Sequence, residues 1–122
     1  MQNNRQVGEA QESQAVLKLE ELGYQILQKN FRCRIGEIDI VARHQGYLVF
    51  VEVKYRKNRN AGYAAEAVNW KKQQVISRVA DFYLRTHCEW IPACRFDVVA
   101  IDGEQILVYE NAFSYIPAGG RR

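Results

Sequence analysis

Three charged residues interrupt an apolar, strand-like stretch between residues 36 and 56: Asp39, Glu52 and Lys54. A charge inside such a stretch is costly unless it faces water, is paired or takes part in chemistry. Two carboxylates and a lysine are residue types that can bind a divalent cation and handle water or phosphate in phosphodiester hydrolysis. These residues therefore form either a solvated strand face or a catalytic site.

The turn in this stretch sets how its two strands face each other. If residues 45–46, Gln-Gly, form a tight two-residue turn, counting back from it places Asp39 opposite Glu52. The same count places Glu37 opposite Lys54. Because side chains alternate along a strand, all four charges are expected on one face of one hairpin.

Opposed carboxylates on such a hairpin need compensation. Side chains directly opposite have Cβ atoms about 4.5–5.5 Å apart, and like charges there are destabilising. Mg²⁺ between Asp39 and Glu52 would relieve the repulsion, because Mg²⁺ binds through one or two carboxylates plus water and substrate phosphates. Lys54 could then hold a nucleophilic water or stabilise charge on a phosphate. The alternative is an exposed ladder of cross-strand ion pairs, since alternating apolar and polar residues are also typical of a solvated sheet face.

The elements that position these residues follow in the order helix, three strands, helix, two strands. The predicted ranges are 6–22 and 64–86 for the helices and 24–32, 37–43, 47–55, 95–101 and 105–111 for the strands. This order predicts an α/β or α+β sandwich with a mixed sheet between two helices. A length of 122 residues fits a single domain, 1–122, with a loose basic tail from about 118.

A glutamate near the start of the first helix is a further candidate. Val16, Leu19 and Leu22 lie on one face at helical spacing, and extending this stripe backwards reaches Glu12 and then Glu9. Glu9 is thus expected on the face that looks at the protein body. It lies either at the exposed helix start, where a negative charge is favourable, or in a site.

The second helix carries an apolar stripe of Val68, Val75, Val79 and Phe82. Lys72 interrupts this stripe near its start. We expect its long side chain to extend and place the ammonium group in water.

Composition and charge narrow the class of protein. Apolar residues make up 48% and charged residues 25% of the chain, close to the average for globular proteins, which argues against a disordered or fibrous class. The first residues lack the apolar core of a signal peptide, and no apolar run approaches the ~20 residues of a membrane span. The expectation is a soluble cytoplasmic protein without a membrane partner.

Basic residues gather around the central hairpin. The net charge of +3 permits nucleic-acid binding without demanding it. Their clustering predicts one positively charged region, with a solvated basic loop as the alternative. The residues of this cluster are Arg32, Arg34, Lys54, Arg56, Lys57 and Arg59.

Two motifs give the chain a family resemblance. GEID at residues 36–39, a short hairpin and EVK at residues 52–54 resemble the signature of the PD-(D/E)xK nuclease superfamily, with Ile38 in place of proline. The stretches LGYQIL, NFR, FVEVKYR and RFDVVAI, with Gly8-Glu9 and the lysines of the second helix, resemble the YraN-like family. Those small bacterial proteins are described as nuclease-like and akin to Holliday-junction resolvases. The likeness extends from about residue 8 to residue 101.

The resemblance implies a restriction-endonuclease-like core and a Mg²⁺- or Mn²⁺-dependent endonuclease acting on DNA, including branched DNA. It implies that Asp39 and Glu52 bind the metal together with the backbone carbonyl of Val53, and that Lys54 positions the attacking water. Glu9 matches a first-helix glutamate that completes the metal site in resolvase-like members.

The resemblance also bears on partners. Basic residues beside the site would contact DNA phosphates, which position a substrate without reading its sequence. Because resolvase-like members act as dimers, the resemblance allows for a homodimer. Two other functions remain open, a nucleic-acid-binding module with little or no cleavage and a structural or protein-interaction domain. The predicted phosphate-binding residues are Arg32, Arg34, Arg56 and Lys57.

Overall fold

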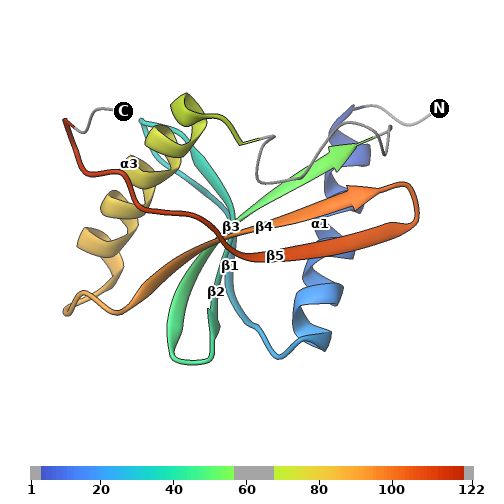
Figure 1. Ribbon diagram of the computed structural model, residues 1–122, viewed down its shortest axis with the longest axis horizontal. Coiled ribbons are helices and arrows are strands. Elements are labelled where there is room, and N and C mark those ends of the chain that lie inside the picture. Colours follow the sequence, from blue (N-terminus) through green and yellow to red (C-terminus); the bar gives the residue numbers. More distant parts are fainter. Residues whose placement is uncertain (1–3, 57–67, 120–122) are drawn as a thin grey trace.

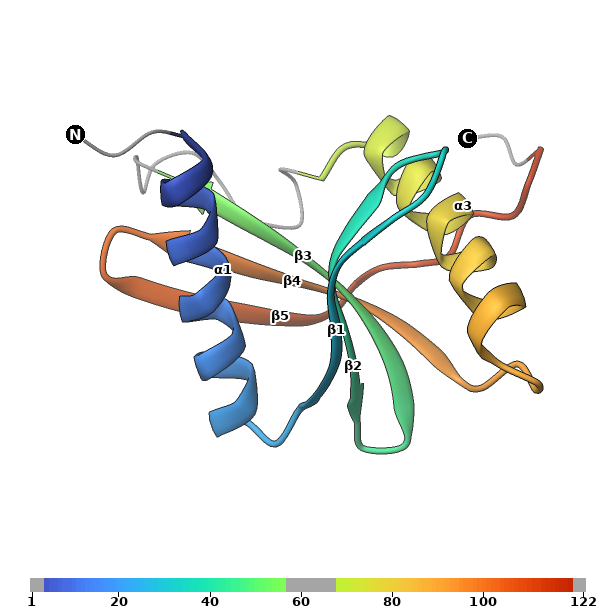
Figure 2. The same cartoon turned by 180° about the vertical axis from the view of Figure 1, so that it is seen from behind.

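The computed structural model describes the backbone of residues 4–56 and 68–119, and the side chains of these residues except 4–7 and 56. Within these ranges the strands form one five-stranded sheet with a helix on each face (Figures 1 and 2). The elements are α1 (Asn4–Glu21), β1 (Gln25–Arg32), β2 (Glu37–His44), β3 (Tyr47–Arg56), α3 (Trp70–His87), β4 (Cys94–Asp102) and β5 (Gln105–Phe113). This order confirms the predicted α-β-β-β-α-β-β arrangement. Residues 120–122 of the predicted loose tail lie outside the described residues.

The sheet is mixed, with the strands side by side in the order β1-β2-β3-β4-β5. All neighbours are antiparallel except β3 and β4, which are parallel. A parallel pair needs a long crossover connection, and α3 lies in the one between these two strands. The core under α3 is built around Phe50 and Phe96, and the core under α1 around Val49, Val51 and Val99.

The β2–β3 hairpin has the predicted two-residue turn. Gln45 and Gly46 have positive φ angles of 51° and 85°, which a two-residue hairpin turn of type I′ requires. The strands pair from His44 opposite Tyr47 back to Ile40 opposite Val51. The predicted register is therefore confirmed over these five pairs.

Beyond Ile40 and Val51 the two strands separate and form a fork (Figure 2). The first half of β2 stays paired with β1 and leans toward α3, whereas the end of β3 stays paired with β4 and runs toward the first half of α1. Ile38 packs in the core under α3, and Ile40 packs in the core under α1. Strand alternation alone would place Ile38 and Ile40 on the same face, but β2 turns over between them, so they pack on opposite faces of the sheet.

Gly36 lets the β1–β2 arm of the fork pack against α3. A Cβ atom at Gly36 would lie 2.8 Å from Val75 Cγ1 and 3.4 Å from Val79 Cγ2. The first distance is shorter than real Cβ contacts, and the branched valine side chain has little freedom to move away. The arm therefore depends on a residue without a side chain at this position.

We expect Gly36→Ala to lower the free energy of unfolding by about 1–3 kcal/mol, because the added methyl group overpacks the contact with α3. Urea unfolding followed by circular dichroism measures this change. Gly8→Ala is the matched control: its Cβ meets nothing within 4 Å, and alanine in a helix is favoured over glycine by about 1 kcal/mol. Equal stability of Gly36→Ala and wild type would contradict the close packing.

The buried face of α1 differs from the predicted stripe. Ala15 and Leu19 are buried, Val16 is half-buried and Leu22 is exposed. The helix ends as predicted at Gly23, whose φ of 92° suits glycine and whose N–H donates to a carbonyl of the last turn. Of the three predicted residues only Leu19 is therefore fully buried, and Ala15, one position before Val16, joins it on the side of α1 that faces the sheet.

The second helix begins later than predicted. Asn69 caps it, because its side-chain oxygen accepts a hydrogen bond of 2.8 Å from the backbone N–H of Lys72. Helix α3 therefore starts at Trp70 and not at residue 64, while residues 64–67 lie outside the described part of the chain. Its buried residues are Ile76, Ser77, Val79, Ala80 and Tyr83. Neither this helix nor any other in the described ranges is long and apolar enough to cross a membrane.

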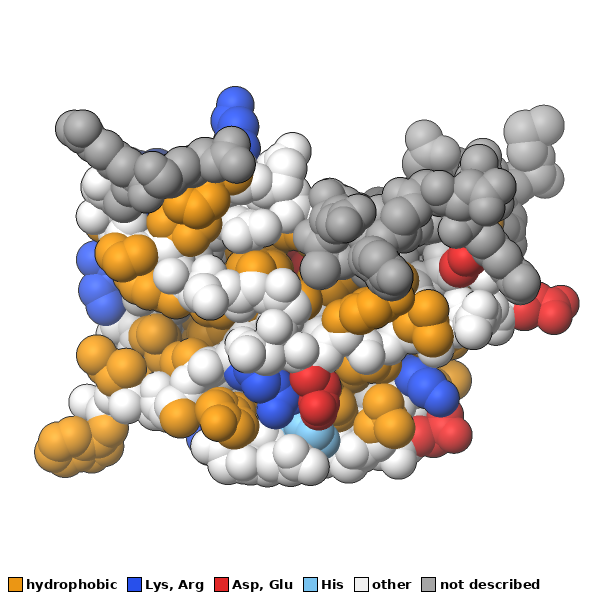
Figure 3. Space-filling view, viewed as in Figure 1, with side chains coloured by type: hydrophobic (Ala, Val, Ile, Leu, Met, Phe, Trp, Pro, Cys, Tyr) orange, Lys and Arg blue, Asp and Glu red, His pale blue; other side chains and the backbone are white. Residues whose placement is uncertain are grey.

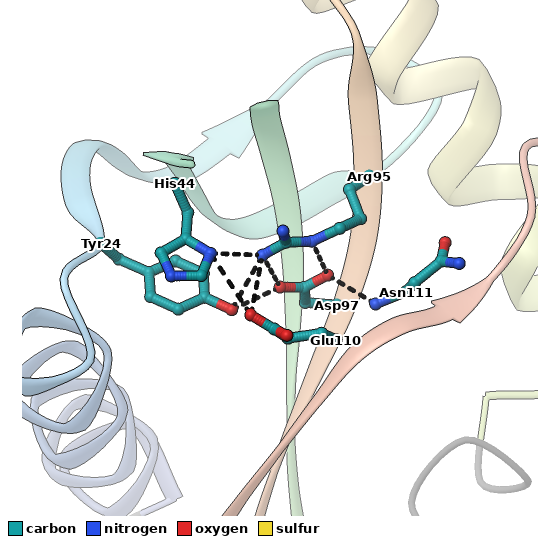
Figure 4. A network of polar contacts seen from close by, with 6 residues as sticks. All are labelled: Tyr24, His44, Arg95, Asp97, Glu110 and Asn111. Carbon is teal, nitrogen blue, oxygen red and sulfur yellow. Dashed lines mark hydrogen bonds and ion pairs between the residues drawn. The ribbon is translucent and has the colours of Figure 1, made fainter. Parts of the chain in front are cut away.

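A buried polar network joins β4 to its surroundings on the α1 face of the sheet (Figure 4). Arg95 donates to both carboxylate oxygens of Asp97, at 2.9 Å from Nε and 2.8 Å from a terminal nitrogen. The Tyr24 hydroxyl donates to the same carboxylate at 2.6 Å, and Asn111 N donates to it at 2.9 Å. Burial and the hydrogen bond to Asp97 raise the pKa of Tyr24. Asp97 is paired with Val51 in the ladder between β3 and β4, so the network lies beside β3 just before the fork.

Candidate active site

The fork brings the two predicted carboxylates to one place. Asp39 Oδ2 accepts a hydrogen bond of 2.8 Å from the backbone N–H of Val53, a side-chain contact made just beyond the last residue pair of the β2–β3 ladder. Glu52 precedes Val53 on β3 and is only 7% exposed. Asp39 is therefore tied to the residue next to Glu52, where the strands separate.

The charge state of Glu52 reflects this crowding. Burial of its carboxyl group, followed by the negative charge of Asp39, raises the pKa of Glu52 to about 8. Lys72 and Lys54 act in the opposite direction without cancelling the shift. At neutral pH and without a metal, Glu52 therefore holds a proton next to the Asp39 carboxylate.

We expect the stability of the metal-free protein to fall as pH rises from about 5 to about 9. Unfolded Glu52 loses its proton near its ordinary pKa of about 4.3, whereas folded Glu52 keeps it up to about pH 8. The resulting stabilisation is complete below the ordinary pKa and is lost as pH rises through 8. Urea unfolding in EDTA measures it, and Glu52→Gln, which cannot titrate, should remove this part of the pH dependence. An unchanged slope in Glu52→Gln would show that Glu52 is not the titrating group.

Asp39 also lines an open pocket of about 480 Å³ on the side of the sheet that α1 covers. The first half of α1, with Glu9 and Glu12, and β1, with Asn30, form its walls together with Val53. Glu9 is exposed and lines the same pocket as Asp39, and its part in a metal site stays a prediction.

Glu12 is the acidic residue that the sequence analysis passed over. It is half-buried, accepts a hydrogen bond of 2.8 Å from Asn30, and has a raised pKa because of burial and then the charge of Asp39. The residue that would have pointed to it is Ala15, which is buried and lies one helical turn further along α1.

The donor set at the fork suits a hard divalent cation with few protein ligands. Within residues 4–56 and 68–119, no three side chains of His, Cys, Asp or Glu converge to hold a metal. What remains is Asp39, Glu52 and the predicted carbonyl of Val53. Mg²⁺ commonly binds through one or two carboxylates and completes its shell with water and substrate phosphates. A divalent cation would relieve the repulsion between these two carboxylates.

Two lysines face the buried carboxylate. Lys54 lies two residues beyond Glu52 on β3, half-buried, and its charge acts on Glu52. Lys72 of α3 places Nζ 3.9 Å from Glu52 Oε1. The prediction that Lys72 extends into water is therefore wrong, because α3 begins beside the fork and directs this side chain to Glu52.

Basic residues line one rim of the site. Arg32 is exposed at the pocket and forms an ion pair of 3.4 Å with Glu37, its partner across the β1–β2 ladder. Glu37 thus pairs with Arg32 and does not oppose Lys54, since the strands have separated. Arg34 is exposed in the turn between β1 and β2.

The remaining predicted phosphate contacts are at the end of β3. Arg56 ends this strand, but its side chain, like Lys57 as a whole, lies outside the described residues. On the face in Figure 3, most described side chains are hydrophobic or uncharged and the basic ones are well separated. The described basic residues of that face therefore form no continuous positive surface.

The element order and the mixed sheet are those of a restriction-endonuclease-like core. The chain belongs to the uncharacterised protein family UPF0102, whose model matches residues 11–101. This family is the YraN-like group, so the resemblance seen in the sequence is confirmed.

Relatives from several bacteria match most of the chain. A UPF0102 protein of Lachnoclostridium phytofermentans is 50% identical over 113 residues, which cover 91% of this chain and 95% of that one. A UPF0102 protein of Photobacterium profundum is 45% identical over 117 residues, covering 89% and 90%. One from Caldicellulosiruptor saccharolyticus is 41% identical over 99 residues, covering 81% and 84%.

Proposed function

We propose that the protein is a metal-dependent endonuclease that hydrolyses phosphodiester bonds in DNA, with Mg²⁺ or Mn²⁺ as its cofactor. The observation that carries this proposal is the pair of acidic residues at the fork: Glu52 is buried and Asp39 is half-buried beside it, and burial followed by the charge of Asp39 raises the pKa of Glu52 to about 8. Two acidic groups held this close destabilise each other when both are ionised, and strongly perturbed carboxylates are common in catalytic sites.

Each residue of the fork has a role in this proposal. Asp39, Glu52 and the carbonyl of Val53 hold the cation, and Glu9 at the pocket completes the site. When bound, the cation makes water a better nucleophile and neutralises charge that develops on the phosphate. Lys54 orients the attacking water and stabilises the same charge. The Asp39–Val53 hydrogen bond keeps the carboxylate in place before substrate arrives.

The basic residues at the rim of the site are proposed to bind the substrate. Arg32 and Arg34, together with Arg56 and Lys57, contact phosphates and position the DNA without selecting a sequence. Branched DNA as a substrate and a homodimeric assembly rest on the resemblance to Holliday-junction resolvases. The cytoplasm is the compartment in which we propose that the protein acts.

The test compares wild type with Asp39→Ala and Glu52→Ala on four-way junctions and on linear duplexes. Wild type should cleave only with Mg²⁺ or Mn²⁺, and each variant should lose at least about 100-fold in rate while keeping the circular dichroism of the folded protein. Glu104→Ala, which changes an exposed glutamate in the β4–β5 turn, is the matched control and should cleave like wild type.

Two outcomes would contradict the proposal. Equal cleavage by all proteins would mean that the activity does not arise at the fork. Absence of cleavage by wild type over many substrates and metals, with salt-sensitive DNA binding retained, would favour the alternative of a nucleic-acid-binding module on a nuclease fold.

A further inference from the structure

The side chain of Lys72 raises a question that the proposed nuclease function leaves open. Its ammonium group lies 3.9 Å from Glu52 Oε1, yet 41% of the side chain is exposed. Glu52 is buried, and the charge of Lys72 acts on it more strongly than that of Lys54. The strongest positive charge on this carboxylate therefore comes from α3, outside the hairpin that carries the sequence motif.

The start of α3 holds Lys72 in this place. The Asn69 side chain accepts the hydrogen bond from the backbone N–H of Lys72 itself, at 2.8 Å. One residue further on, Gln73 Nε2 donates to Val68 O at 2.7 Å and fastens the chain that enters the helix. The backbone of Lys72 is thus fixed on a rigid element, whereas its four-carbon side chain can turn.

A cation at the fork would compete with Lys72 for Glu52. Two positive charges on one carboxylate repel each other, so metal binding should drive the ammonium group away from Glu52. The exposed half of the side chain leaves it free to move toward solvent, where a DNA phosphate would arrive at the same site. A phosphate of bound DNA would then offer the ammonium group another anion.

We propose that Lys72 is an exchangeable cation of the site: its ammonium group lies against the Glu52 carboxyl group before the divalent cation binds, and it then contacts the phosphate of the DNA being cleaved. This inference rests on the proposed nuclease function. It assigns to Lys72 two effects of opposite sign, weakening of metal binding and strengthening of DNA binding. A purely structural lysine would support both, and its loss would weaken both.

The sign of the metal effect does not depend on the protonation of Glu52. A divalent cation that displaces one proton still adds one positive charge beside Lys72. Lys72→Gln should therefore bind Mn²⁺ about 3- to 10-fold more tightly than wild type. The same substitution should raise the KM for DNA about 3- to 10-fold, with little change in kcat, because the lost contact is made in both ground state and transition state.

The experiment measures Mn²⁺ binding to the protein alone by calorimetry and steady-state cleavage of DNA at saturating Mn²⁺. Lys72→Arg keeps the charge and should restore both values toward wild type. Lys71→Gln is the matched control, since Lys71 is an exposed neighbour on the same helical turn, and it should leave Mn²⁺ affinity unchanged.

The outcomes separate this inference from the function on which it rests. Wild type that neither binds Mn²⁺ nor cleaves DNA would overturn the proposed function, and the role of Lys72 with it. Wild type that binds and cleaves, together with a Lys72→Gln variant whose Mn²⁺ affinity is unchanged or weaker, would overturn the role of Lys72 alone.

Discussion

Lys54→Met is expected to lower kcat for DNA cleavage by about 100- to 10,000-fold, the range that a single acid–base or charge-stabilising group typically supplies. Methionine matches the length and apolar stem of lysine, so the packing of β3 should persist. Binding of Mn²⁺ should remain, because Lys54 supplies no metal ligand. Cleavage kinetics and calorimetry on the same preparation measure both properties.

Two further variants sharpen the interpretation of Lys54. Lys54→Arg keeps the positive charge but spreads it over a planar group, so it should recover only a small part of the rate if a compact ammonium must orient water. Lys71→Met, at an exposed lysine, should retain wild-type kcat. Full activity of Lys54→Met would exclude Lys54 from the chemical step and leave the fork without its proposed water-orienting group.

The second large effect is expected at the buried network of β4. Asp97→Asn should lower the free energy of unfolding by about 3–5 kcal/mol, because it removes the buried counter-ion of Arg95, which the half-exposed Glu110 at 3.5 Å replaces incompletely. Asp97 is fully buried and Arg95 is 8% exposed, so water cannot take over the role of the carboxylate. Urea unfolding monitored by circular dichroism measures the loss.

A double substitution and a surface control complete this test. Arg95→Met combined with Asp97→Asn should cost less than the sum of the single changes, because it removes both charges together. Asp81→Asn breaks a half-exposed ion pair with Arg78 and should cost less than about 1 kcal/mol. A loss of less than about 1 kcal/mol for Asp97→Asn as well would show that the network does not hold β4 in place.

The hairpin could be predicted from the sequence because its determinants are local. A two-residue turn at Gln45 and Gly46 fixes the register of both strands, and five pairs follow from it. The point where pairing stops is not local. It follows from the packing of Gly36 against Val75 of α3, a contact between residues 39 positions apart in the chain. Counting back from the turn therefore places Asp39 near Glu52 correctly, but it extends the paired ladder beyond Ile40 and Val51, where pairing ends.

The residues that the sequence analysis misjudged depend on tertiary contacts. Lys72 was expected in water because it interrupts the apolar stripe of a helix that was predicted to begin at residue 64. The asparagine at position 69 is the signal for the true start, since asparagine is a favoured N-cap residue. Glu12 lies on the stripe extended back from Leu22, but it was not proposed as a site residue because the family resemblance pointed to Glu9.

The buried network could not be predicted from local sequence patterns. Tyr24 and Asp97 are separated by 73 positions, and although the stretches LGYQIL and RFDVVAI contain them, neither stretch indicates that they meet. Only the folded sheet shows that a tyrosine directly before β1 and an aspartate in β4 share a hydrogen bond.

The most direct test of the metal site is the anomalous difference density of crystals soaked in Mn²⁺. We expect a Mn²⁺ ion at the fork, with one oxygen of Asp39 and one of Glu52 each within about 2.0–2.5 Å of it. Lys72 should be turned away from Glu52. Crystals with no Mn²⁺ between these carboxylates at saturating concentration, and with Lys72 still beside Glu52, would contradict it.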